Sequence, residues 1–82
     1  MTRLPRDVSG DEMVALLSRF NYVVDRQTGS HVRLTTEAKG EHHVTVPRHG
    51  ALRLGTLSAI VGDVAEHFGA TRNDVIERLF GS

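Results

Sequence analysis

A glycine, a serine and a histidine stand together at residues 29–31, where a polar stretch meets a run of residues typical of a strand. Glycine supplies the backbone freedom of a tight turn, and a serine side chain hydrogen-bonds readily to nearby backbone. Imidazole is the one side chain whose ordinary pKa lies near neutrality, so a histidine delivered by a turn can give or take a proton. Gly29-Ser30-His31 therefore points to acid–base chemistry.

The strands that follow should gather polar side chains on one face, because successive residues of a strand point to opposite faces. The apolar residues are expected to face the core: Val32, Leu34, Val44 and Val46. The opposite, open face then collects the polar residues of the same strands: His31, Arg33, Thr35, His43 and Thr45.

An imidazole beside guanidinium groups suits a reaction on a phosphodiester. Arginine pairs bidentately with phosphate oxygens, and histidine can take the proton of a ribose 2′-hydroxyl or give one to the leaving oxygen. His31 is the candidate for this proton transfer, and His43 is a candidate for a second one. The sequence does not decide which group is the partner of His31.

Other roles for the histidines remain open at this stage. Residue type alone is compatible with a structural or incidental role for a surface histidine. His42, His43 and His49 are an alternative metal site, although adjacent strand residues point to opposite faces. His67 is expected to lie at a helix end, where a cation favours the helix dipole.

Helices and strands follow one another in an order that would hold these residues on one sheet. Ser9 begins a capping box before a helix that should end near Asn21, since asparagine tolerates the left-handed conformation found there. Thr56 is the expected N-cap of a second helix that ends at Gly69, and Thr71 begins a short third helix. Runs of β-branched and aromatic residues predict strands at 22–26, 31–36 and 42–46, the last stopped by Pro47.

The element order is therefore α-β-β-β-α, with an extra short helix at the C-terminus. Two amphipathic helices and one three-stranded meander make a two-layer α+β sandwich. Both helices should bury their apolar stripes on the same sheet face, which leaves the other face open to a ligand.

The composition describes a small domain with a basic middle section. The 82 residues contain no cysteine, which excludes disulfides and thiolate metal sites and suits a reducing cytoplasm. No apolar run approaches the roughly 20 residues that span a bilayer, and the start of the chain has no signal-peptide pattern, so no membrane association is expected.

The net charge is zero, but from Arg26 to Thr56 five bases stand against two acids. Such a section can concentrate phosphate on one face, although a neutral chain argues against a generic polyanion binder.

Several motifs, in order, resemble those of HicA toxins, also called YcfA-like proteins. The resemblance covers roughly Leu4 to Leu79, so residues 1–82 are expected to form a single HicA-like domain. Its most specific motifs are Gly29-Ser30-His31-Val32-Arg33-Leu34, Val44-Thr45-Val46-Pro47-Arg48-His49 and Leu54-Gly55-Thr56-Leu57.

The resemblance implies a fold like that of double-stranded-RNA-binding domains, in agreement with the element order. It implies the stress-response toxin of a type II HicAB toxin–antitoxin system: an mRNA interferase, or sequence- or structure-selective endoribonuclease. The histidine of the glycine-serine-histidine motif, here His31, is implied to be catalytic, and a HicB-type antitoxin is implied to cover it. We expect metal-independent chemistry with no cofactor, and RNA contacts from Arg26, Ser30, Arg33, His43 and Arg48.

Two alternatives belong to other functional classes. One is a non-catalytic RNA-binding module of the same fold. The other is a DNA-binding or protein-interaction domain that uses residues 71–80 in a helix-turn-helix, although Arg72 is the one strong base on its recognition turn.

Overall fold

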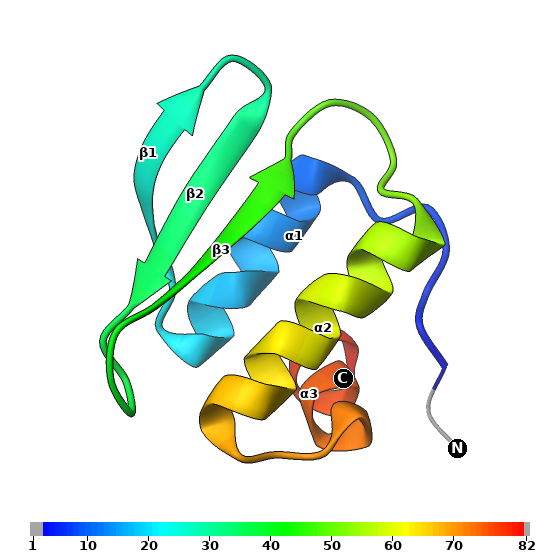
Figure 1. The fold of residues 1–82 in the computed structure, drawn as a ribbon. Helices are drawn as coiled ribbons and strands as arrows, with labels where there is room; N and C mark the ends of the chain where they lie inside the picture. Colours follow the sequence, from blue (N-terminus) through cyan, green and yellow to red (C-terminus); the bar gives the residue numbers. More distant parts are fainter. Residues whose placement is uncertain (1–2, 82) are drawn as a thin grey trace.

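The computed structural model describes residues 3–81, which form a three-stranded sheet with helices packed on one side (Figure 1). This arrangement confirms the expected α+β, α-β-β-β-α sandwich with an additional C-terminal helix. None of the helices in this part of the chain is long and apolar enough to cross a membrane. In chain order the elements are α1 (Gly10–Leu17), the 3₁₀ turn η1 (Ser18–Phe20), β1 (Val23–Thr28), β2 (His31–Thr36), β3 (His42–Pro47), α2 (Leu54–Phe68) and α3 (Arg72–Phe80).

The first helix begins with the predicted capping box. The Ser9 hydroxyl accepts from the Glu12 backbone N–H, and the Glu12 carboxylate accepts from the Ser9 backbone N–H, both at 3.0 Å. The helical segment continues through η1 and ends at Asn21, whose φ of 66° is left-handed as expected. The buried side chains of this segment belong to Met13, Leu17 and Phe20.

The sheet is antiparallel in the order β1-β2-β3, and the helices cover only part of it. The four predicted core residues of the second and third strands are buried. Every residue of β1 is exposed, including Val23 at 65% and Val24 at 54%. The helical layer therefore lies over β2 and β3 and leaves β1 as an uncovered edge.

The second helix begins three residues earlier than the sequence predicts. Its N-cap is Arg53, with an extended ψ of 145°, and not Thr56, and no side chain caps it. The preceding loop is attached to the residues before α1 through a hydrogen bond of 2.7 Å from the Leu52 N–H to the Val8 carbonyl oxygen. The chain just before α2 is thus held by a long-range backbone hydrogen bond, and the helix starts at Leu54 without a side-chain cap.

The remaining boundaries lie close to the predicted ones. Thr71 caps α3 by accepting from the Asp74 N–H at 3.1 Å. The strands β1 and β3 extend two residues and one residue beyond their predicted ends, to Thr28 and Pro47. Both of these residues pair with His31, so the sheet continues up to the tight turn that precedes it.

Candidate active site

His31 is placed by a two-residue turn at the end of the β1–β2 hairpin. Thr28 and His31 are paired, so Gly29 and Ser30 alone make the turn. Gly29 has a φ of 56°, and glycine is the residue that favours such a conformation at the first turn position. The His31 side chain is exposed, and it forms no hydrogen bond or ion pair with residues 3–81. Its imidazole is therefore accessible to a ligand.

The turn end of the open face, defined as Arg26, Thr28 and His31, carries positive charge that forms no ion pair with an acid of residues 3–81. The register sets Thr28 beside His31 and Arg26 beside Arg33, and residues paired across antiparallel strands share a face. Arg26 is exposed and has no ion pair within the described part of the chain. The turn end therefore presents a guanidinium and an imidazole to an incoming anion.

The opposite end of the open face is a continuous hydrogen-bonded chain, which we call the network end: Asp25, Arg33, Thr35, His43 and Glu41. The Asp25 carboxylate accepts from Arg33 at 2.8 Å and from the Thr35 hydroxyl at 3.0 Å. The Thr35 oxygen lies 2.6 Å from His43 Nδ1, and His43 Nε2 lies 2.9 Å from Glu41. Hydrogen bonds from Arg33 and Thr35 lower the pKa of Asp25, so this group remains a carboxylate at neutral pH. Both nitrogens of His43 are already engaged.

A β-bulge brings Asp25 to the open face. The register of β1 against β2 shifts just before Arg26, so two β1 residues oppose Arg33. Strict alternation would place Asp25 and Arg26 on opposite faces, which is why sequence analysis missed Asp25. It also missed Glu41, although the spacing of two residues to His43 is a usable signal that both share a face of extended chain.

The register also separates the two histidines of the open face. His31 pairs with Pro47, whereas His43 pairs with Thr35, four residues farther along β2. Four residues of extended chain span about 13 Å. Two groups that transfer protons at one phosphodiester must both lie within hydrogen-bond reach of it. This separation disfavours His43 as the second proton-transfer group beside His31. It places His43 where it would contact a different phosphate of the same RNA.

Arg48 connects three elements near the turn. Its Nε donates to Asp11 at 2.7 Å, and its Nη1 donates to Gln27 at 2.9 Å. Its backbone N–H donates to the Ser30 carbonyl oxygen at 2.6 Å. Arg48 therefore ties the start of α1 and the end of β1 to the turn, and its charge already has a carboxylate partner.

A close contact between α1 and the end of β3 fixes the backbone beneath the turn end. A Cβ atom on Gly10 would clash with the Pro47 carbonyl oxygen and would lie 2.7 Å from the Cα of Arg48. The Gly10 N–H donates to the Gly50 carbonyl oxygen at 3.2 Å. Because Pro47 is the cross-strand neighbour of His31, this contact helps to position the candidate catalytic residue.

The three histidines considered as a metal site are not brought together. His43 lies on the open face, and His42, the preceding residue, contacts side chains of the helical layer. His49 lies in the loop after β3. Among residues 3–81, no three histidine, cysteine or acidic side chains are arranged to hold a metal ion.

His42 belongs instead to an aromatic cluster beneath the network end. Its ring stacks on that of His67, with centroids 4.5 Å apart, and its Nδ1 lies 2.8 Å from the Tyr22 hydroxyl. His67 stands in the last turn of α2, as expected, and its Nε2 also lies 2.9 Å from the Ala38 carbonyl oxygen. Burial raises the pKa of Tyr22 to about 12, so its hydroxyl keeps its proton at neutral pH. Burial and the neighbouring His67 lower the pKa of His42.

Comparison with known proteins assigns the chain to a family. Residues 10–69 match the family model described as the HicA toxin of bacterial toxin–antitoxin. This range contains α1, the whole sheet and α2, together with the His31 turn and both ends of the open face. No curated protein and no solved structure gives a match. Since the family match covers more than half of the chain, the protein belongs to the HicA toxin family of bacterial toxin–antitoxin systems.

Proposed function

We propose that the protein is an endoribonuclease that cleaves mRNA, with His31 as a proton-transfer group. The observation that carries the proposal is the exposed imidazole of His31, which has no partner within residues 3–81 and lies on the same sheet face as Arg26 and Arg33. Membership of a toxin family supports a destructive activity. An imidazole with both nitrogens unengaged can exchange protons with a substrate without first breaking a protein contact.

The reaction that fits this face uses the RNA as its own nucleophile. The 2′-oxygen of a ribose attacks the adjacent phosphorus, and the bond from phosphorus to the 5′-oxygen breaks. The 2′-hydroxyl loses a proton, the 5′-oxygen gains one, and the products carry a 2′,3′-cyclic phosphate and a 5′-hydroxyl. His31 takes the first proton or supplies the second. No metal ion is needed for either transfer.

The cationic side chains have separate tasks in this proposal. Arg26 and Arg33 hold the phosphate that reacts or its neighbours. Arg33 uses Nε and Nη2 on Asp25, which leaves further N–H donors for phosphate. Ser30 and Arg48 extend the contact along the turn, and His43 contacts RNA about two phosphates away.

RNA cleavage by the purified protein tests the proposal. We expect His31→Ala to lower the cleavage rate by about 100- to 10,000-fold, the range of a general acid–base catalyst, while RNA binding is retained. His49→Ala is the matched control, because His49 is also exposed and lies in the neighbouring loop, and it should leave the rate unchanged. EDTA should have no effect on the rate.

A substrate with 2′-deoxyribose at the scissile position sharpens the test, because it lacks the nucleophile. Cleavage of that substrate, or equal rates from wild type and His31→Ala, contradicts the proposed mechanism. If the wild type binds RNA without cleaving it under any of these conditions, the non-catalytic RNA-binding module is the better description.

We also propose that a HicB-type antitoxin covers the open face and excludes RNA by occupying it. The positive turn end favours an acidic partner surface and an association rate that falls as salt rises. Hydrogen exchange on the complex should then show protection over residues 26–33 and β3. Protection restricted to the helices, with the His31 turn as exposed as in the free protein, contradicts this mode of control.

A further inference from the structure

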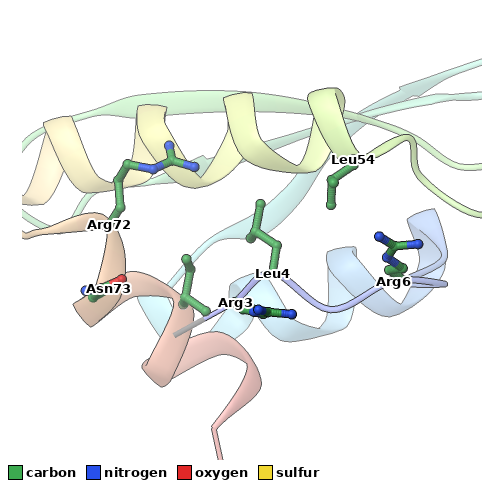
Figure 2. A pocket seen from close by; sticks show the side chains of 7 residues that line it. Arg3, Leu4, Arg6, Leu54, Arg72 and Asn73 are labelled. Carbon is green, nitrogen blue, oxygen red and sulfur yellow. The ribbon is translucent and has the colours of Figure 1, made fainter. Parts of the chain in front are cut away.

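A cavity on the helical side of the molecule combines positive charge with an apolar floor. It has a volume of about 450 Å³ and lies between the N-terminal segment, the start of α2 and α3 (Figure 2). No strand residue lines it, so the helical layer separates it from the open sheet face (Figure 1). Its lining residues are Arg3, Leu4, Arg6, Leu54, Arg72, Asn73 and Ile76.

The charge of the cavity comes from three arginines, and no carboxylate of residues 3–81 lines it. Arg3 and Arg6 are exposed and form no ion pair with residues 3–81. Arg72 is held against α2, because its Nη1 donates to the Ser58 carbonyl oxygen at 3.1 Å and its Nη2 to the Ser58 hydroxyl at 2.7 Å. This fixed guanidinium still has N–H donors to offer to an anion. The cavity is therefore suited to a ligand with more than one negative group.

The floor of the cavity indicates which anionic ligand fits. Leu4, Leu54 and Ile76 are aliphatic, and Leu54 is 50% exposed although it is a large apolar side chain. No aromatic side chain lines the cavity, so it lacks the platform on which nucleobases stack. The volume lies within the range of about 300–1,000 Å³ that is typical of binding sites. A ligand that carries carboxylates beside aliphatic side chains therefore matches this surface better than a nucleic acid does.

We propose that this cavity binds an acidic segment of a protein partner. Carboxylates of the segment pair with the three arginines, and an aliphatic side chain covers the floor that Leu54 leaves exposed. The molecule measures 35 × 30 × 21 Å, so about ten residues of extended chain lead from the open face around to the cavity. A partner that covers the sheet is therefore able to occupy both sites, which raises its overall affinity through a high effective concentration.

NMR titration of the full-length, ¹⁵N-labelled protein tests this proposal. The probe is an acetylated and amidated hexapeptide with the sequence Glu-Leu-Glu-Glu-Leu-Glu. We expect saturable shifts at the amides of Leu4, Leu54 and Ile76. The double variant Arg3→Ala/Arg6→Ala should bind the peptide at least about tenfold more weakly, since it loses two charge-assisted contacts. Lys39→Ala removes an exposed cation from the distant β2–β3 loop and should leave the affinity unchanged.

Two control peptides separate the contributions of charge and of the floor. Replacement of glutamate by glutamine, or of leucine by serine, should each weaken binding. Equal binding of all three peptides, no saturable shift, or preferential binding of inorganic phosphate or an RNA hexamer at these amides overturns the proposal.

RNA cleavage by Arg3→Ala/Arg6→Ala should equal that of the wild type. Loss of cleavage in this folded variant would assign the cavity to RNA and also overturn the proposal, whereas failure of the ribonuclease proposal leaves the peptide result unaffected.

Discussion

The two ends of the open sheet face carry similar residue types in different electrostatic surroundings. At the turn end, Arg26 and His31 have no ionic partner within the described residues. At the network end, Arg33 is paired with Asp25, and His43 lies between Thr35 and Glu41. The arginine and histidine of the turn end are therefore not equivalent to those of the network end, because two carboxylates neutralise charge and take up part of the hydrogen-bonding capacity at the network end.

The two ends also differ in what holds them in place. The side chains of the network end hold one another through hydrogen bonds. At the turn end the backbone is held, by the glycine turn at Gly29 and by the contact of Gly10 with the end of β3, while the His31 side chain is left free. The fixed backbone places the imidazole at the surface, and its unengaged nitrogens leave it able to exchange protons with a substrate.

Disrupting the backbone beneath the turn end has the largest expected effect. Gly10→Ala forces a Cβ against the Pro47 carbonyl oxygen, and such overpacking lowers the free energy of unfolding by about 1–3 kcal/mol. Urea unfolding measures this loss. Gly55→Ala is the matched control, because Gly55 also lies in the first turn of a helix and a Cβ there meets nothing within 4 Å. Equal losses in both variants, or none in Gly10→Ala, would show that the close contact is unimportant.

Removing one acid should make the network end resemble the turn end. Asp25→Asn takes a negative charge from beside Arg33, so the contact of this guanidinium with phosphate is no longer neutralised by a neighbouring carboxylate. For single-stranded RNA, the slope of log affinity against log salt should steepen by about 0.7, the contribution of one phosphate contact. Binding of an uncleavable 2′-O-methyl RNA at several salt concentrations measures the slope.

Asp74→Asn provides the control for that measurement. It changes the net charge equally, but Asp74 lies in the first turn of α3 and not in the sheet. The slope should not change in this variant. Equal changes in the two variants would mean that overall charge, and not the pairing of Arg33, governs RNA affinity.

The smallest expected effect is a loss of folding stability at acid pH, caused by His42 in the aromatic cluster beneath the network end. The pKa of His42 is lowered in the folded protein, whereas the unfolded chain has the ordinary value of about 6.5. The unfolded state therefore binds a proton at higher pH than the folded state does. Folding stability should fall as the pH decreases below about 6.5 and should level off below the folded-state pKa.

Urea midpoints between about pH 5 and about pH 8 measure this dependence. His42→Phe keeps an aromatic ring against His67 but removes the titrating group, so its midpoint should vary less over this range. An identical pH dependence in both proteins would assign the effect to other groups.

The sequence predicted the features that depend on local rules. Alternation placed the core residues of β2 and β3 correctly, and the caps at Ser9 and Thr71 formed as expected, because each depends on residues only a few positions apart. The prediction that Thr56 caps α2 was wrong, because this helix follows a loop whose position is set by a hydrogen bond to Val8, far away in the sequence. The network end was not foreseen, because the bulge that turns Asp25 to the open face interrupts the alternation on which the prediction relied.

The uncovered edge strand has a consequence for the charge of the candidate site. Because β1 buries no side chain, it is joined to the rest of the fold mainly through its pairing with β2. Segments with little burial open by local unfolding at a lower free-energy cost than the whole domain. Each opening of β1 would carry Asp25 and Arg26 together away from Arg33 while β2, β3 and the helices keep their packing. The position of the unpaired guanidinium on this face, Arg26 when β1 is paired and Arg33 when it is open, is therefore set by the opening equilibrium of one strand.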